Sequence, residues 1–327
     1  MKHFVFLGTV LAISAGALAA GATPRVGSLS TVASFDPAAF ELPESVTIDQ
    51  DGTFYLSMGP TVRRLAPGGE LELLAALPLP PGSFADGVKV GPDGDVYTVS
   101  GNFAPEPSGA FVWRIEPSGA VHQVAALDPQ GFPDDLTFDD DGNLFVTDAF
   151  LGTVWKIDPQ GNAGVWLQSP LFLGDPANPA VVIHDFGSCG IAFDPSGENL
   201  YVANLDRGRI VRIPVEDGEP GTPEVFAEDP LLVGADGIAF DKKGTLYVGA
   251  QTQDRVAAVA PDGTISVVVE GGILDAPASL VFGTAPSDRK TLYIANFAIS
   301  RALGTQPGAP HPGLLSLPVG TRGLPLF

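Results

Sequence analysis

The stretch Asp236-Gly-Ile-Ala-Phe-Asp-Lys-Lys-Gly-Thr-Leu-Tyr-Val248 decides the fold, because related stretches occur six times along the chain. In each copy an acidic or small residue precedes an apolar run, and in most copies a tight glycine turn leads to a second apolar run. The copies begin at positions 44, 86, 134, 189, 236 and 278, at intervals of 42, 48, 55, 47 and 42 residues. A period of roughly 40–50 residues with several strands per copy is typical of β-propeller blades.

Each copy is predicted to form four antiparallel strands. In the fifth copy these strands are expected at Gly237–Asp241, Thr245–Gly249, Arg255–Ala260 and Thr264–Val269. The four segments are rich in Val, Ile and other β-forming residues, and Gly, Pro and Asp bound them, as expected for strands joined by tight turns.

The last copy lacks a fourth strand, and the N-terminal part of the chain offers one. Gly313–Val319 resembles the third strand Arg209–Val215, and the chain ends soon afterwards. Thr31–Asp36 resembles Gln123–Asp128, the fourth strand of the second copy. We therefore predict an all-β, six-bladed propeller over residues 23–327, in which the N-terminal strand completes the last blade. Such closure removes the open sheet edges that promote aggregation.

Composition limits the partners of this 327-residue chain. It has 38 acidic and 17 basic residues, with a formal net charge of −21. This charge repels phosphate backbones and anionic lipids, so we expect a small-molecule substrate and no nucleic acid. A ring without free edges favours a monomer. The single cysteine, Cys189, excludes an internal disulfide.

Residues 1–22 resemble a secretory signal peptide. Lys2 precedes an apolar run from Phe4 to about Ala20, and two small-x-small cleavage sites follow. We interpret the segment as cleaved, with no membrane insertion afterwards, and expect a secreted or periplasmic protein.

The first residues of the six copies are the candidate site. In a propeller, the turns between strands one and two lie on one face and are short here, whereas connections on the other face are long and irregular, as binding loops are. We expect six residues before the first strands at the channel mouth of the irregular face: Glu44, Asp86, Asp134, Cys189, Asp236 and Ala278. Four are carboxylates, whose mutual repulsion a divalent cation such as Ca²⁺ would relieve. Alternatively, these residues only form turns.

A second group of polar residues follows the second strands, and its amide and carboxylate oxygens suit Ca²⁺, which takes 6–8 oxygen ligands. The group comprises Asn102, Asp148, Asn204, Gln251 and Asn296. His184 lies in a loop on the same face. The residues predicted to bind substrate are Asp86, Asn102, Asp148, His184, Asn204 and Asn296. The alternative is that Asn and Asp at strand ends bond nearby backbone groups.

Over roughly residues 26–320 the pattern resembles the senescence marker protein/gluconolactonase family of six-bladed propellers, and also strictosidine-synthase-like and NHL-type propellers. In the first family a Glu before blade one and an Asp before blade five bind a divalent metal, and that Asp is also a base in lactone hydrolysis. The resemblance implies Glu44, Asp134 and Asp236 as metal ligands and Asp236 as the catalytic base. Cys189 stands where the family has a ligating Asn, and it is a poor ligand for Ca²⁺ or Mg²⁺.

The resulting hypothesis is a metal-dependent hydrolase of a lactone or related ester. The alternative is a non-enzymatic secreted propeller that binds a small molecule or a protein on its loop-rich face. A condensing enzyme like strictosidine synthase has no specific support, because Ala278 stands where a catalytic Glu is expected before blade six.

Overall fold

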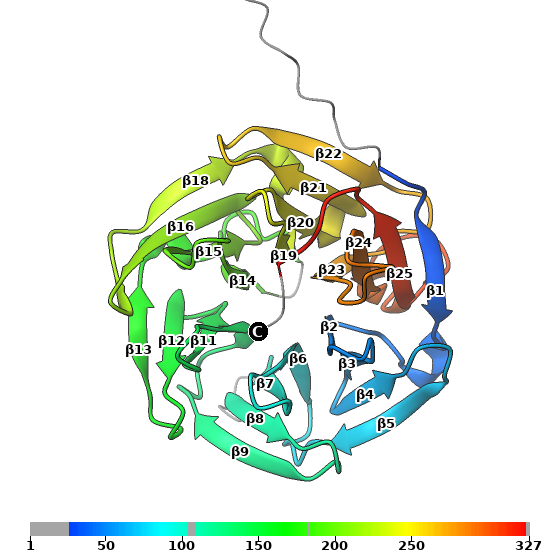
Figure 1. The fold of residues 1–327 in the computed structure, drawn as a ribbon, viewed down its shortest axis with the longest axis horizontal. Helices are drawn as coiled ribbons and strands as arrows, with labels where there is room; N and C mark the ends of the chain where they lie inside the picture. The colour runs from blue at the N-terminus through cyan, green and yellow to red at the C-terminus, as the bar shows by residue number, and fades with distance from the viewer. Residues whose placement is uncertain (1–25, 104–108, 182–183, 325–327) are drawn as a thin grey trace, which may run out of the picture.

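The computed structural model describes residues 26–103, 109–181 and 184–324. Six antiparallel sheets surround a central axis, as Figure 1 shows, so the predicted six-bladed β-propeller is confirmed. The predicted signal peptide, residues 1–22, lies outside the described residues, and export stays a prediction. Within the described part of the chain, no helix is both long and apolar enough to cross a membrane.

Each blade contains four main strands, numbered outward from the channel. Blades one to three contain β2 (Ser45–Ile48), β3 (Phe54–Met58), β4 (Thr61–Leu65), β5 (Leu71–Ala76); β6 (Ser83–Val90), β7 (Val96–Asn102), β8 (Phe111–Ile115), β9 (Val121–Ala126); and β10 (Pro133–Phe138), β11 (Leu144–Asp148), β12 (Thr153–Ile157), β13 (Ala163–Gln168). Blades four to six contain β14 (Ser188–Phe193), β15 (Asn199–Asn204), β16 (Arg209–Glu216), β18 (Glu224–Glu228); β19 (Ala235–Phe240), β20 (Leu246–Ala250), β21 (Arg255–Val259), β22 (Ile265–Glu270); and β23 (Pro277–Phe282), β24 (Thr291–Asn296), β25 (Gly313–Pro318), β1 (Ser30–Ser34).

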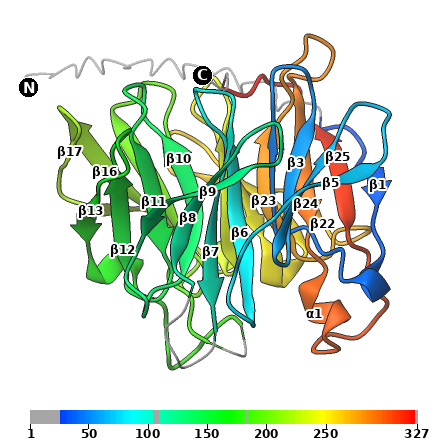
Figure 2. The ribbon, with the colours of Figure 1, turned by 90° about the horizontal axis from the view of Figure 1, so that it is seen from below.

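The remaining elements are short. The strand β17 (Glu219–Pro220) pairs with β16 at the edge of blade four. Four 3₁₀ turns occur in the connections: η1 (Pro37–Ala39), η2 (Pro170–Phe172), η3 (Pro230–Leu232) and η4 (Gln251–Gln253). The helix α1 (Ile299–Ala302) belongs to the connection between β24 and β25, at the lower edge of the ring in Figure 2.

The N-terminal strand closes the ring as predicted. β1 pairs antiparallel with β25, and Thr31 lies opposite Leu315. Figure 1 shows β1 at the outer edge of the last blade, beside β25. Phe35, just after β1, is buried in the core between blades six and one. The two ends of the chain are therefore joined by hydrogen bonds and by apolar packing.

The hydrophobic core lies between the blades. One cluster joins Tyr201 and Ile210 of blade four to Ile238 and Leu246 of blade five. Alternation along each strand makes this possible, because successive side chains point to opposite faces of a sheet. Each blade thus buries one face against each neighbour.

Glycines at the inner strands allow these strands to approach one another closely. A Cβ atom at Gly237 would lie 2.5 Å from the carbonyl oxygen of Ala278 and 2.6 Å from the Cα of Ser279. Gly87 and Gly190 face the backbone of the next blade in the same way. Because backbone atoms cannot move aside as a flexible side chain can, only glycine fits here. This explains the glycine after the first residue in three of the six copies.

Candidate metal centre in the channel

β-bulges position the candidate residues in the central channel. The pairing of β19 with β20 shifts register between Ala235 and Ile238, which leaves Asp236 and Gly237 outside the regular ladder. Asp134 and Cys189 occupy corresponding shifts on β10 and β14. A bulge adds a residue to one strand and changes the direction of its side chains, and it often occurs beside a functional site.

The predicted position of these residues was wrong in one respect. Asp86, Asp134, Cys189 and Asp236 lie within the first strands rather than before them. They are buried, with Asp236 4% exposed and Cys189 fully covered, rather than placed at an open mouth. The cause is the bulge, which keeps both of its residues inside the sheet.

Three donor atoms come together inside the ring of six positions formed by the first residues of the copies, which are Glu44, Asp86, Asp134, Cys189, Asp236 and Ala278. One side-chain oxygen each from Asp134 and Asp236 and the Sγ of Cys189 all lie within 4.8 Å of one another. Among the described residues, these three are the acidic, cysteine or histidine side chains whose ligand atoms all lie this close to one another. The structure thus brings together two of the three predicted metal ligands and adds Cys189, which the sequence had indicated as a poor ligand.

Glu44, the third predicted ligand, lies beside this trio. It lines the same small cavity as Asp134, Asp135 and Asp236. Its Oε2 is buried and has no hydrogen-bond partner. The Glu44 carboxyl also shares hydrogen bonds with Asp86 and Ser57. Because a buried acceptor without a partner is costly, a proton or a cation is expected at Oε2. The free space in the cavity, about 10 Å³, has the size of one water molecule or ion.

Burial and mutual repulsion raise the pKa values of the ring carboxyls. Burial, followed by the charge of Glu44, raises the pKa of Asp236 well above its ordinary value. Burial and then the Asp236 charge do the same to the pKa of Asp134. For Glu44 the causes of the raised pKa are burial and then Asp86. Without a cation, the folded protein therefore keeps protons in this ring.

The thiol of Cys189 is part of the same network. Burial, followed by the charges of Asp134 and Asp236, raises its pKa well above the ordinary value. The thiol and the Asp134 carboxyl also share a hydrogen bond, which lowers the pKa of Asp134 against the effect of burial. In the absence of a metal ion, Cys189 is a protonated thiol that donates to a carboxylate.

Gln251 contacts Asp236, although it was not among the residues predicted to bind the metal or the substrate. Its Nε2 donates to Oδ2 of Asp236 at 2.6 Å. Gln251 lies in η4, directly after β20, where the sequence had placed the second group of polar residues. That position was the available signal, but the sequence alone did not show that the amide contacts Asp236.

Three members of the second group hold backbone connections in place. Asp148 Oδ1 accepts from the amide of Phe132 at 2.9 Å, as well as from those of Phe150 and Leu151. The Nδ2 groups of Asn204 and Asn296 each donate to two backbone carbonyls. These bonds correspond to the alternative role predicted for residues at strand ends. Asn102 ends β7, and its contact with substrate stays a prediction.

An aromatic cluster lies next to the thiol. Phe132 is at its centre, with the ring centroids of the other phenylalanines 4.9–5.6 Å away: Phe84, Phe103, Phe150 and Phe186. Phe132 and Phe186 share a buried apolar cluster with Cys189. His184 stacks on Phe150, with centroids 3.8 Å apart, and is exposed. The aromatic cluster therefore packs on the Cys189 side of the candidate metal centre.

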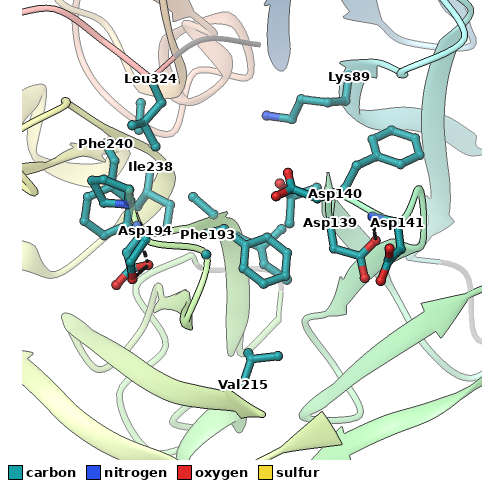
Figure 3. A pocket seen from close by; sticks show the side chains of 18 of the residues that line it. Lys89, Asp139, Asp140, Asp141, Phe193, Asp194, Val215, Ile238, Phe240 and Leu324 are labelled. Atoms are coloured by element: carbon teal, nitrogen blue, oxygen red, sulfur yellow. Dashed lines mark hydrogen bonds between the residues drawn. The ribbon is translucent and has the colours of Figure 1, made fainter. Parts of the chain in front are cut away.

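A larger cavity occupies the channel on the face of the short turns. Its volume is about 600 Å³. Figure 3 shows Lys89 extending into it, with Phe193, Phe240 and Leu324 on other walls. Ile238, which also lines it, directly follows Gly237 of the small cavity. The larger cavity thus adjoins the ring, but it opens on the face opposite to the one predicted for substrate.

The donor set fits a divalent cation. Asp134 and Asp236 supply two carboxylates, Glu44 supplies an oxygen that lacks a partner, and Cys189 supplies a sulfur. A cation placed among them would neutralise the charges that now raise the pKa of each carboxyl.

Comparison with known proteins supports the predicted resemblance. The family described as SMP-30/Gluconolactonase/LRE-like region matches residues 175–298. A gluconolactonase of Zymomonas mobilis is 26% identical over 254 residues, which cover 71% of this chain. The chain spans 65% of the length of that relative. The resemblance that the sequence indicated is confirmed.

Solved structures show the same fold at lower identity. A putative gluconolactonase matches with a TM-score of 0.65 and 18% identity over 90% of this chain and 93% of its own. Regucalcin from Agrobacterium tumefaciens, described as a calcium-binding protein, has a TM-score of 0.65 and 17% identity over 89% and 94%. A gluconolactonase from Xanthomonas campestris has a TM-score of 0.63 and 16% identity over 91% and 95%. At these identities the likeness establishes the propeller fold.

Proposed function

We propose that this chain, which resembles the SMP-30/gluconolactonase/LRE-like family, is a metal-dependent hydrolase of a lactone or related ester. The observation that carries the proposal is the meeting of Asp134, Cys189 and Asp236 beside the unpartnered oxygen of Glu44. The gluconolactonases among the similar proteins support the same reaction class.

Four side chains would hold the cation: Glu44, Asp134, Cys189 and Asp236. When bound there, a divalent cation polarises the ester carbonyl and stabilises the negative charge that develops on its oxygen. The protein contributes the burial of these donors, since removing water strengthens each electrostatic interaction in the channel.

Asp236 is the proposed general base. It is a buried carboxylate in the channel beside the proposed cation site, where a positioned side chain can take a proton from water. Gln251 holds Oδ2 by a hydrogen bond, which leaves Oδ1 outside that bond. We assign the Asp236 carboxylate to accept a proton from the attacking water. The water oxygen bonds to the acyl carbon, the bond between the acyl carbon and the ring oxygen breaks, and the proton held by Asp236 passes to the departing alkoxide oxygen.

The larger cavity is the proposed substrate space. Its volume of about 600 Å³ suits a small molecule. The charged Lys89 and the aromatic Phe193 and Phe240 all line this cavity. Together they would accept a polar ring with an apolar face. The proposed substrate site is therefore on the short-turn face rather than on the loop-rich face.

The test is hydrolysis of a panel of lactones and esters by the purified protein, with and without a chelator. Asp236→Asn should reduce kcat by about 10²-fold or more, the usual range for a lost general base. Gln251→Leu should shift the pH profile of kcat, because Asp236 Oδ2 loses its hydrogen bond from the Gln251 amide. Hydrolysis that survives both chelation and Asp236→Asn would refute the proposal.

A binding protein without catalytic activity is the second candidate. The observation in its favour is that the larger cavity is lined by residues other than the four proposed ligands. Binding of a small molecule that is unaffected by chelation and by Asp236→Asn, with no turnover of any lactone, would favour this candidate.

A further inference from the structure

We infer that Cys189 makes the ring a mixed oxygen and sulfur site that selects zinc over calcium. The inference rests on the metal site of the proposed function, but it does not depend on lactone hydrolysis. Its basis is the position of the Sγ among the ligand atoms, rather than the presence of a cysteine in the sequence.

The geometry places sulfur where a metal ligand has to be. The Cys189 Sγ lies within 4.8 Å of an oxygen of Asp134 and of an oxygen of Asp236. Tetrahedral zinc bonds of about 2.3 Å to sulfur and about 2.1 Å to oxygen separate ligand atoms by about 3.6 Å. The observed trio, whose ligand atoms lie no more than 4.8 Å apart, therefore reaches zinc spacing after a contraction of at most about 1.2 Å.

A second observation points independently to a ligand at this position. Glu44 Oε2 is buried without a hydrogen-bond partner, and Glu44 lines the cavity together with Asp134 and Asp236. Its oxygen is a suitable fourth donor. Asp134, Asp236 and Cys189 supply three protein ligands, and the Glu44 oxygen supplies a fourth, while the expansion of zinc to five ligands leaves a position for a substrate oxygen.

Calcium is disfavoured at the same place. Ca²⁺ takes 6–8 oxygen ligands, whereas two of the six ring positions carry Cys189 and Ala278, which supply no side-chain oxygen. A thiolate is a soft ligand that favours zinc and later transition metals over calcium and magnesium. The free space of about 10 Å³ also leaves little room for the waters that would complete a calcium site.

Metal binding has to release protons. Zinc binds cysteine as the thiolate rather than as the thiol. On binding, the sulfur loses its proton to solvent and bonds to the metal as a thiolate, and any carboxyl that held a proton releases it as well. The apparent affinity for zinc should therefore rise with pH.

Cobalt(II) is the probe, because a bond to thiolate produces a sulfur-to-cobalt charge-transfer band in the near ultraviolet. The chain has one cysteine, so the band can arise only from Cys189. The purified protein, stripped with a chelator, should bind one equivalent of Co²⁺ and show this band. One equivalent of Zn²⁺ should remove it, whereas a thousandfold excess of Ca²⁺ should not.

Two variants separate the role of sulfur from that of the other ligands. Cys189→Asn and the nearly isosteric Cys189→Ser should lose the band. They should bind Zn²⁺ more weakly by more than about a hundredfold, since losing even an outer hydrogen-bond partner of a ligand costs about 10–100-fold. Calcium affinity should stay the same or rise, because both substitutions add a side-chain oxygen at this position. Thermal melts of both variants verify that they fold.

The outcomes distinguish this inference from the proposed function. Co²⁺ bound without the band, or Ca²⁺ displacing it at comparable concentration, would overturn the zinc preference even if the lactonase activity is present. A band on the wild-type protein with no hydrolysis of any lactone would support the zinc site and refute the enzyme. The band needs no variant, so a misfolded Cys189 variant does not remove the test.

Discussion

Removing divalent cations should make the folded protein less stable as the pH rises from 5 to 8. The cause is the raised pKa of the carboxyls of Glu44, Asp134 and Asp236. Burial is the largest contribution to this rise for each of them. In the unfolded chain, these groups ionise near pH 4. Between the two pKa values the folded protein holds more protons than the unfolded chain, so the free energy of unfolding falls with pH.

The structure sets the size of this effect. Oxygens of Asp134 and Asp236 lie within 4.8 Å of each other, and at an effective dielectric constant of about 20 two charges at that distance repel by roughly 3.5 kcal/mol. The pair should therefore keep about one proton at neutral pH. Each retained proton lowers the free energy of unfolding by about 1.4 kcal/mol per pH unit, as long as the pH lies between the unfolded and the folded pKa.

Urea unfolding at several pH values, in the presence of a chelator, measures this slope through tryptophan fluorescence. Asp236→Asn should remove about one proton from it, because an amide keeps the bond to Gln251 and carries no charge. Asp262→Asn is the matched control. It changes the net charge equally, but Asp262 is exposed and the hydrogen bonds from Thr264 lower its pKa.

The slope should disappear or reverse when the metal ion is saturating, because binding displaces the protons. A free energy of unfolding that stays constant or rises with pH in the metal-free protein would refute the reasoning. An equal slope in the wild type and in Asp236→Asn would locate the effect outside the ring. An altered slope in Asp262→Asn would assign it to net charge.

Three further changes test the fold and the site. Gly237→Ala should lower the free energy of unfolding by roughly 1–3 kcal/mol, because the new Cβ meets backbone of the next blade, whereas Gly164→Ala, which meets no atom within 4 Å, should be neutral in the same urea assay. Deleting residues 23–37 should lower the melting temperature and cause self-association in size-exclusion chromatography, because it exposes the edge of β25; an unchanged melting temperature would contradict the closure. Asp148→Ala should destabilise the protein by roughly 1–3 kcal/mol, because three backbone amides lose their acceptor, while one-equivalent Co²⁺ binding persists; loss of that binding would place Asp148 in the metal site.

The propeller could be predicted because its signals are local and repeated. Six copies of one strand pattern determine the number of blades, and the strands of the fifth copy were expected within one or two residues of their observed bounds. The completion of the last blade by Thr31–Asp36 could also be predicted, because this segment resembles the fourth strand of another copy and the last copy lacks one. The ring order of Glu44, Asp134 and Asp236 follows from the order of the blades.

The sequence alone was less informative about which ring residues touch. Cys189 was predicted to be a poor ligand because Ca²⁺ and Mg²⁺ prefer oxygen, yet its sulfur lies among the ligand atoms. No sequence pattern indicated the hydrogen bond between Gln251 and Asp236. Asp148, Asn204 and Asn296 look the same in sequence whether they face a substrate or hold a loop. Only the hydrogen bonds to backbone groups distinguish the two roles.

The amino-acid sequence therefore specified the toroid and the identity of the residues around its axis, because strand periodicity and glycine turns act over a few neighbouring residues. The tertiary structure decided that a sulfur joins two carboxylates, that Glu44 has an oxygen without a partner, and that the larger cavity opens on the short-turn face. These features depend on how closely one blade approaches the next. That distance is set by bulges and by backbone contacts between residues about 45 positions apart, which no local pattern encodes.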